Sequence, residues 1–308
     1  MTNELSAARE VIVMSVNDAA VASCDDVVRA YTEIAPLALR YWGPELHYGF
    51  WEDAHDTSPI EVAVARLTAI VIERLRVGAG GHVLDLGCGY GRPAVEVART
   101  TGARVTAVDV DPGAVAAAAE HAHRAGLADL VRVARCDGDD LPFPENSFDA
   151  VLSFESTPHF EIGELYPRIR RMLRPGGRLV VETPVFRETV TPELQKRVAD
   201  FFDLLRIRSF ETTETHHETA RRSGLEIVET VDITRHVDGS FTRLAQRLRR
   251  HEDELAADYG AAEAGRLIDL FADWGRVAEI GAMIMVARRA PEDAGEGRGE
   301  AEEARNRA

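Results

Sequence analysis

A glycine-rich segment that directly follows a short apolar stretch constrains the fold of this chain more than any other feature. Residues 82–86 read His-Val-Leu-Asp-Leu, and residues 87–91 read Gly-Cys-Gly-Tyr-Gly. The first stretch is typical of a short buried strand, and glycines at every second position allow a tight turn and a close approach of the backbone to a ligand. The segment therefore predicts a strand that ends in a ligand-binding turn.

Strand-like and helix-like stretches alternate around this turn. Further strands are predicted at 104–108, 131–134, 150–154, 178–181, 225–233 and 282–286, and helices at 58–77, 93–100 and between Asp111 and Gly126. Such alternation is typical of βαβ units and favours an α/β fold with a Rossmann-like, doubly wound parallel sheet covered on both faces. Ligands of such sheets bind beyond the carboxyl ends of the strands, so the loops after residues 86, 108, 134 and 154 are expected to line one crevice.

The pattern along the chain divides it into three parts. We expect an N-terminal helical cap segment at 1–57, a ligand-binding domain at 58–290 and a disordered acidic tail at 291–308, because the tail contains nothing large and apolar. Two helices between about residues 239 and 280 are expected to form a lid inserted before the last strand. The helix at 58–77 is expected to begin in a capping box at 58–61, with Pro59 at its first helical position.

The composition excludes several classes of function. The chain has 36 basic and 52 acidic residues, and its formal net charge of −16 argues against nucleic acid and an anionic membrane as partners. Its apolar runs are too short for a membrane span, and no secretory signal is recognisable. The three cysteines are widely spaced, which predicts no zinc cluster and favours a reducing, cytoplasmic location. The oligomeric state stays open, a homodimer included.

Three acidic residues follow three successive predicted strands. The dinucleotide pattern G-x-G-x-x-G fails here because Arg92 stands where its third glycine belongs. A pyrophosphate has little use for the carboxylate of Asp85, whereas a ligand with an ammonium group does. Asp109 ends the next strand, where an acid hydrogen-bonds ribose hydroxyls, and Asp137 is placed to accept from an adenine amino group. The three loops are therefore expected to hold an amino-acid moiety, a ribose and an adenine.

These motifs resemble the class I S-adenosylmethionine (SAM)-dependent methyltransferases. The resemblance covers roughly residues 60–182 and rests on VLDLGCGYGRPA (83–94), VTAVDVDP (105–112), CDGDDLPFPENSFDAVLSFES (136–156) and LRPGGRLV (173–180). ELHYGFWED (45–53) and ESTPHF (155–160) are similar to a narrower group of small-molecule enzymes. That group is related to rebeccamycin sugar O-methyltransferase, tocopherol methyltransferases and sarcosine/dimethylglycine methyltransferases, and many of its members act in natural-product biosynthesis.

The resemblance implies SAM as the cofactor and a role for each loop. The cofactor's methionine part would lie along the glycine turn, with Asp85 near its ammonium group and Tyr48 closing over it. Its ribose would lie at Asp109 and its adenine between the loops that follow. The residues that would contact the cofactor are Tyr48, Asp85, Gly87, Gly89, Gly91, Asp109, Val110, Asp137 and Gly138.

The resemblance further implies methyl transfer to a small-molecule acceptor, for which a hydroxyl oxygen is the expected nucleophile. His159 is the candidate base, since a histidine suits proton transfer near neutral pH. Related sugar O-methyltransferases carry two adjacent histidines here and an aspartate after the fifth strand, whereas this chain has Pro158-His159 and Thr183. Glu182 is the candidate to orient or assist His159. C- or N-methylation, a non-catalytic SAM-binding protein and a nicotinamide oxidoreductase remain alternatives, and no metal is expected.

Overall fold

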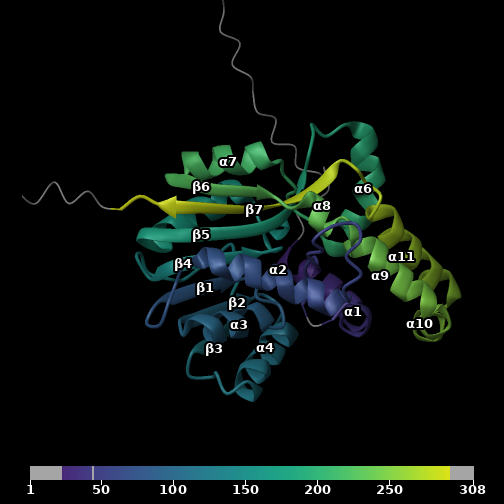
Figure 1. Cartoon of the computed structure of the whole chain (residues 1–308), viewed down its shortest axis with the longest axis horizontal. Coiled ribbons are helices and arrows are strands. Elements are labelled where there is room, and N and C mark those ends of the chain that lie inside the picture. Colours follow the sequence, from purple (N-terminus) through teal and green to yellow (C-terminus); the bar gives the residue numbers. More distant parts are fainter. Residues whose placement is uncertain (1–22, 44, 292–308) are drawn as a thin grey trace, which may run out of the picture.

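The computed structural model describes residues 23–43 and 45–291, so the predicted tail at 291–308 lies almost wholly outside the described residues. Seven strands form the centre of the molecule: β1 (His82–Leu86), β2 (Arg104–Asp109), β3 (Val131–Arg135), β4 (Phe148–Phe154), β5 (Leu173–Phe186), β6 (Leu225–Asp232) and β7 (Ile280–Arg289). They pair into one sheet in the order β3-β2-β1-β4-β5-β7-β6 (Figure 1). The predicted Rossmann-like α/β fold is confirmed.

The helices precede, separate and follow these strands. They are α1 (Cys24–Tyr41), α2 (Ile60–Leu75), α3 (Arg92–Thr101), α4 (Pro112–Arg124), α5 (Ile162–Met172), α6 (Pro192–Leu205), α7 (Thr213–Arg222), α8 (Thr234–Val237), α9 (Gly239–Arg250), α10 (Glu252–Tyr259) and α11 (Ala261–Trp274). A single 3-10 turn, η1 (Thr157–His159), follows β4. None of the described helices combines the length and the apolar character that a bilayer crossing requires.

The sheet departs from the predicted parallel arrangement at one strand. β7 runs antiparallel to both of its neighbours, β5 and β6, while the remaining pairs are parallel. The chain enters β7 from the end of the sheet where α11 lies, so the strand has to run back through the gap between β5 and β6 (Figure 1). An apolar run such as 282–286 carries no signal of direction, which is why the sequence did not predict the reversal.

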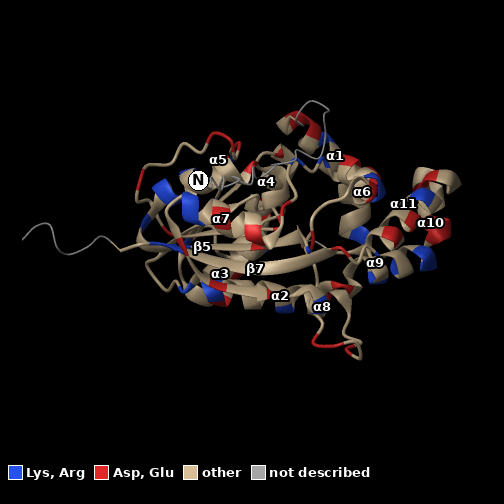
Figure 2. Cartoon of the chain, turned by 90° about the horizontal axis from the view of Figure 1, so that it is seen from above, with Lys and Arg blue, Asp and Glu red and all other residues tan. Residues whose placement is uncertain are grey.

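Helices cover both faces of the sheet. Side chains of α2, α3 and α4 pack with one set of strand residues, and side chains of α5 and α7 pack with the alternate set. Figure 2 shows α2 and α3 on one side of the edge-on sheet and α5 and α7 on the other. Burial on both faces explains why the central strands read as continuous apolar runs rather than as alternating ones.

The start of α2 differs from its predicted capping box. The helix begins at Ile60, Pro59 takes the N-cap position, and no side chain caps it. The carbonyl of Ser58 instead accepts a hydrogen bond from the Trp51 indole at 3.0 Å, and its hydroxyl accepts from Arg66 at 3.4 Å. Tertiary contacts with the preceding segment have replaced the local cap.

A second group of helices gathers beyond the carboxyl ends of the parallel strands. α1, α6, α9, α10 and α11 lie together at that end of the molecule (Figures 1 and 2). Their apolar faces form a core of their own, in which the Phe201 ring stacks on Trp274 with centroids 3.8 Å apart. Three helices, rather than the predicted two, occupy residues 239–274. The loops of the sheet that carry the predicted site therefore face aromatic and aliphatic side chains of this helical group.

Candidate functional site

A cleft opens at the carboxyl ends of β1, β2, β3 and β4, where the sequence predicted one. It encloses about 1240 Å³ of empty space, part of it open to solvent. The predicted positions that line it are Asp85, Gly87, Gly89, Asp109, Val110, Asp137 and Gly138, joined by Cys24, Val27, Val28 and Tyr31 from α1. The four loops thus meet in one crevice, and the N-terminal helix closes one side of it.

The glycines of the turn have different structural roles. Gly87 has a φ of +71°, and an added Cβ would stand 2.5 Å from the Cβ of Ser156. Gly89 has a φ of +51°, and an added Cβ would meet no protein atom within 4 Å. Gly91 caps α3 with a φ of +74°, and its Cβ would stand 2.6 Å from the Cβ of Ala118 in α4. Gly91 does not line the cleft, so it serves helix packing, whereas Gly89 leaves space for a ligand.

Asp85 and Asp109 stand at the end of neighbouring strands. Asp109 accepts hydrogen bonds from the backbone amides of Gly89 at 2.8 Å and Asp111 at 3.0 Å, which fixes the glycine turn to β2. Asp85 is buried, and its Oδ2 has no hydrogen-bond partner among the described residues. Burial, and after it the charge of Asp109, raises the pKa of Asp85 to about 7. A buried acceptor without a donor is suited to a ligand that brings a cation.

The loop after β3 forms the far end of the cleft. Asp137 accepts from the amide of Asp139 at 2.8 Å and from the thiol of Cys24 at 3.1 Å. Gly138 lies beneath Phe160, whose ring would stand 2.1 Å from an added Cβ. Val110 lines the same end from the loop after β2. Apolar contacts from Val110 and Phe160, with the carboxylate of Asp137 in the same lining, suit an adenine ring.

A second cavity adjoins the first on the side of the helical group. It encloses about 860 Å³ and is lined by aromatic and aliphatic residues of α1, α6, α9 and α11, among them Ile34, Trp42, Phe201, Phe241, Phe271 and Trp274. No lysine, arginine or aspartate belongs to its lining. Tyr48 lines this cavity and not the cleft, with its ring edge-on to Phe241 at 5.5 Å. Tyr48 therefore stands on the side of the second cavity, and its expected contact with the cofactor stays a prediction.

Five residues line both cavities and so mark the junction between them: Tyr31, Leu46, His47, Glu155 and His159. His47 stacks on Phe154 with centroids 4.0 Å apart. Glu155 adopts a φ of +49°, a left-handed conformation that is costly for a residue with a side chain and that often marks functional sites. Its carboxyl accepts from the backbone amide of Tyr48, and burial raises its pKa to about 8.

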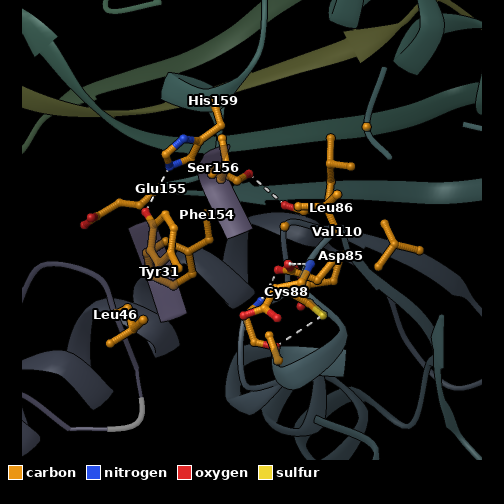
Figure 3. A pocket seen from close by; sticks show the side chains of 18 of the residues that line it. Tyr31, Leu46, Asp85, Leu86, Cys88, Val110, Phe154, Glu155, Ser156 and His159 are labelled. Atoms are coloured by element: carbon orange, nitrogen blue, oxygen red, sulfur yellow. Dashed lines mark hydrogen bonds between the residues drawn. The ribbon is translucent and has the colours of Figure 1, made fainter. Parts of the chain in front are cut away.

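His159 ends η1 at this junction. Its Nε2 lies 2.9 Å from the hydroxyl of Tyr31, and the two rings meet edge-on (Figure 3). Burial lowers the pKa of His159 to about 4, with a smaller contribution from the charge of Arg208 in the same direction. The imidazole is therefore neutral at physiological pH.

Glu182 is not brought to His159 by any described hydrogen bond. It lines neither cavity, and neither of its carboxyl oxygens has a hydrogen-bond partner in the described part of the chain. It pairs in the sheet with Phe154, and its pKa is raised by burial and by the charge of Glu155. The expected pairing of Glu182 with His159 fails because β5 turns this side chain into the core, while Tyr31 takes the place beside the imidazole.

Tyr31 and Cys24 line the cleft but were not among the residues predicted for the site. α1 carries no motif of its own, so its local sequence does not indicate which of its residues face the cleft. The sole signal was Glu155, the first residue of the motif ESTPHF, which comes directly after a strand. Across 23–43 and 45–291, no group of three metal-ligand side chains is close enough to hold a metal ion.

The cleft fits the cofactor that the resemblance implied. The unpartnered Asp85 carboxyl matches an ammonium group, the open space at Gly89 matches a ligand passing close to the backbone, and the slot at Val110 and Gly138 matches an adenine. Asp109 keeps lone pairs for ribose hydroxyls, because each of its oxygens accepts only one described hydrogen bond.

Comparisons with known proteins agree with this geometry. A sequence profile described as a methyltransferase domain matches residues 84–181. Methyltransferase GfsG of Streptomyces halstedii is 33% identical over 205 residues, which cover 66% of this chain and 74% of that protein. The 27-O-demethylrifamycin SV methyltransferase of Amycolatopsis mediterranei is 28% identical over 272 residues, or 86% of this chain and 97% of that protein.

A solved structure extends the similarity over both cavities. The crystal structure of the [4+2]-cyclase SpnF superimposes with a TM-score of 0.77 at 29% identity, covering 88% of this chain and 98% of that one. The match therefore includes the helices that build the second cavity as well as the sheet.

Proposed function

The chain belongs to the class I SAM-dependent methyltransferases, and from this membership we propose that it transfers a methyl group to a hydroxyl oxygen of a large, uncharged natural-product intermediate. The observation that carries the proposal is the apolar cavity that meets the cofactor cleft at Tyr31, Glu155 and His159. When bound, SAM supplies an activated methyl group on a positively charged sulfur. The chain's own residues have to align the acceptor with that methyl group and receive the proton that the hydroxyl loses.

Residues of the cleft would hold SAM in the order that the loops follow along the sheet. Asp85 would bind the ammonium group, Gly89 would leave room for the methionine part, and Asp109 would bind the ribose. Val110, Asp137 and Gly138 would enclose the adenine. The orphaned carboxyl of Asp85 and the open space beside Gly89 support this assignment.

The lining of the second cavity defines the acceptor class. Glu155 and His159 are its only acidic or imidazole side chains besides His47, and raised and lowered pKa values keep Glu155 and His159 neutral near pH 7. A phosphorylated or zwitterionic acceptor would therefore be buried without a counter-charge, which is costly. An apolar acceptor with hydroxyl groups would bury its skeleton against Phe241 and Trp274.

His159 is the base in this proposal. A neutral imidazole with a low pKa suffices, because the oxygen of the acceptor becomes strongly acidic as it gains the methyl group. The loop that carries His159 is held by backbone hydrogen bonds. The carbonyl of Pro158 accepts from the amides of Arg208 at 2.8 Å and Ser209 at 3.1 Å. His159 is thereby anchored to the segment that leads into α7.

The test is transfer of label from methyl-labelled SAM. The purified protein is incubated with neutral hydroxylated polyketide lactones and terpenoid alcohols, and separately with sarcosine and a prenyl diphosphate. We expect extractable labelled methyl ethers from the neutral alcohols alone, identified by NMR. Labelling of sarcosine or of the diphosphate would contradict the acceptor class, and a new C–CH3 or N–CH3 group would contradict O-methylation.

A ring closure is the second candidate function, because the solved [4+2]-cyclase is similar over 88% of this chain. An aromatic-lined cavity without charges suits the folding of a flexible polyene. An intramolecular ring closure leaves the mass of the product unchanged and consumes no SAM. A SAM-bound protein that isomerises a diene–alkene polyketide and labels no alcohol would favour this function over methyl transfer.

A further inference from the structure

Resting on the proposed O-methylation, we propose that the hydroxyl of Tyr31 is the group that meets the acceptor's hydroxyl and passes its proton to Nε2 of His159. Tyr31 would then be a catalytic residue supplied by the N-terminal helix, and His159 would act through it. The inference starts from the junction of the two cavities, to which Tyr31 contributes from α1.

Tyr31 stands beside His159, and both residues line both cavities. Its hydroxyl lies 2.9 Å from Nε2, and Figure 3 shows this hydroxyl pointing at the imidazole. The other ring nitrogen, Nδ1, is buried and makes no described hydrogen bond of normal geometry. An acceptor hydroxyl that approaches Nε2 would therefore meet the oxygen of Tyr31, which is already within hydrogen-bond distance of that nitrogen.

The protonation states favour a relay in one direction. Burial raises the pKa of Tyr31, so its hydroxyl keeps its proton, and the neutral His159 ring carries one proton as well. The relay uses the tautomer with the ring proton on Nδ1, in which Nε2 is an acceptor and the hydroxyl of Tyr31 donates to it.

The groups around the pair leave this assignment unchanged. Glu155 and Asp109 face Tyr31 as acids that disfavour its ionisation, and Arg208 faces His159 as a cation that disfavours a charged ring. α1 is held in place at its start by a capping box between Ser23 and Asp26.

The step balances as follows. The acceptor's oxygen forms a bond to the methyl carbon with a lone pair while the bond from that carbon to sulfur breaks, and its electrons stay on the sulfur. The acceptor's proton passes to the oxygen of Tyr31 as the proton of Tyr31 passes to Nε2 of His159. Tyr31 ends as it began, and His159 holds the proton as imidazolium until solvent removes it.

The experiment compares Tyr31→Phe with Tyr41→Phe, a matched control on the same helix. Tyr41 is buried, its hydroxyl has no described partner, and it lines neither cavity. In protein labelled with 15N-histidine, the His159 signals are assigned from their loss in His159→Gln. We expect Tyr31→Phe alone to shift the Nε2 resonance toward that of an unbonded imidazole nitrogen. An unchanged resonance, or an equal shift in Tyr41→Phe, would overturn the inference.

Kinetics with a neutral alcohol acceptor give the second readout. We expect Tyr31→Phe to lower kcat by about 10²-fold or more, with KM for the acceptor and the affinity for S-adenosylhomocysteine within about threefold of wild type. His159→Gln should have a similar effect, and the double variant should lose little more than either alone, because the two residues act as a unit. A Tyr31→Phe variant with an unchanged or higher kcat would show that the acceptor meets His159 directly. Failure of the wild type to methylate any alcohol would instead reject the proposed function, and the relay with it.

Discussion

Asp85 and Asp109 lie side by side at the ends of two adjacent parallel strands, but only Asp109 has its carboxylate satisfied by backbone hydrogen bonds. Asp109 is held by two backbone amides, whereas Asp85 is buried with a free Oδ2, and the charge of Asp109 helps to raise its pKa to about 7. A protein that keeps a buried carboxyl unpaired beside a second acid is arranged to gain from binding a cation at that point.

Cofactor binding should therefore be linked to protons. Below pH 7 the empty protein holds a proton on Asp85 that the ligand's ammonium group displaces, so affinity falls as the pH is lowered. Between pH 7.5 and 5.5 we expect S-adenosylhomocysteine to bind at most roughly thirtyfold more weakly. Calorimetry in two buffers of different ionisation enthalpy should show proton release at pH 6.5. Asp85→Asn should bind weakly with a flat pH dependence, and a pH-independent wild type would contradict this role.

Substitution of Gly91 should mainly lower the stability of the fold, whereas substitution of Gly89 should mainly weaken ligand binding. Gly91→Ala forces a Cβ against the backbone of Ala118, 3.0 Å from its Cα, so it should destabilise the fold by about 1–3 kcal/mol. Gly89→Ala bears a similar left-handed φ without a steric neighbour, so it should cost about 1 kcal/mol and weaken S-adenosylhomocysteine binding more than tenfold. Thermal unfolding measures the loss of stability, and calorimetry measures the affinity for S-adenosylhomocysteine. Equal effects of the two substitutions on this affinity would contradict the prediction.

The buried carboxyl of Glu182 should lower the free energy of unfolding at high pH. Its pKa in the folded protein is raised above its ordinary value, so the folded state favours the protonated form, and stability is lost as the pH rises. Glu182→Gln should match the wild type near pH 5 and exceed it by about 1–3 kcal/mol at pH 8.5. Urea unfolding at both pH values measures the difference. Glu226→Gln, an exposed substitution on β6, is the control and should change little at either pH.

The arginines of α9 should act in structure rather than in binding an acidic acceptor. Arg243 stacks over Trp51 at 4.2 Å and donates to the carbonyl of Asp56 at 3.0 Å, while Arg247 binds Glu61 at 2.7 Å. Arg243→Met should lower the free energy of unfolding by about 1 kcal/mol and leave S-adenosylhomocysteine affinity unchanged. A loss of methyl transfer without a loss of stability would show instead that this side chain serves the acceptor.

The Rossmann-like sheet and the cleft at the carboxyl ends of its first strands could be predicted from the sequence. Strand–turn–helix units are local, so a short window such as 82–91 contains both the strand and the turn it ends in. Parallel strands bring their carboxyl ends to one edge, and this places Asp85, Asp109 and Asp137 together without knowledge of any side-chain packing. The direction of β7 was not predictable in this way, since an apolar run reads the same in a parallel and an antiparallel strand.

The second cavity and its junction with the cleft were decided by tertiary structure alone. Tyr31 meets His159 across 128 residues of sequence, and Trp274 meets Phe201 across 73. An amphipathic helix records which of its faces is apolar but not which partner covers it. The sequence by itself therefore determined where the cleft at the ends of β1 to β4 lies, because backbone topology fixes that place. Only the packing of α1, α6, α9 and α11 decided the second cavity and the partner of His159, because apolar contacts are non-directional and do not specify which partner a residue packs against.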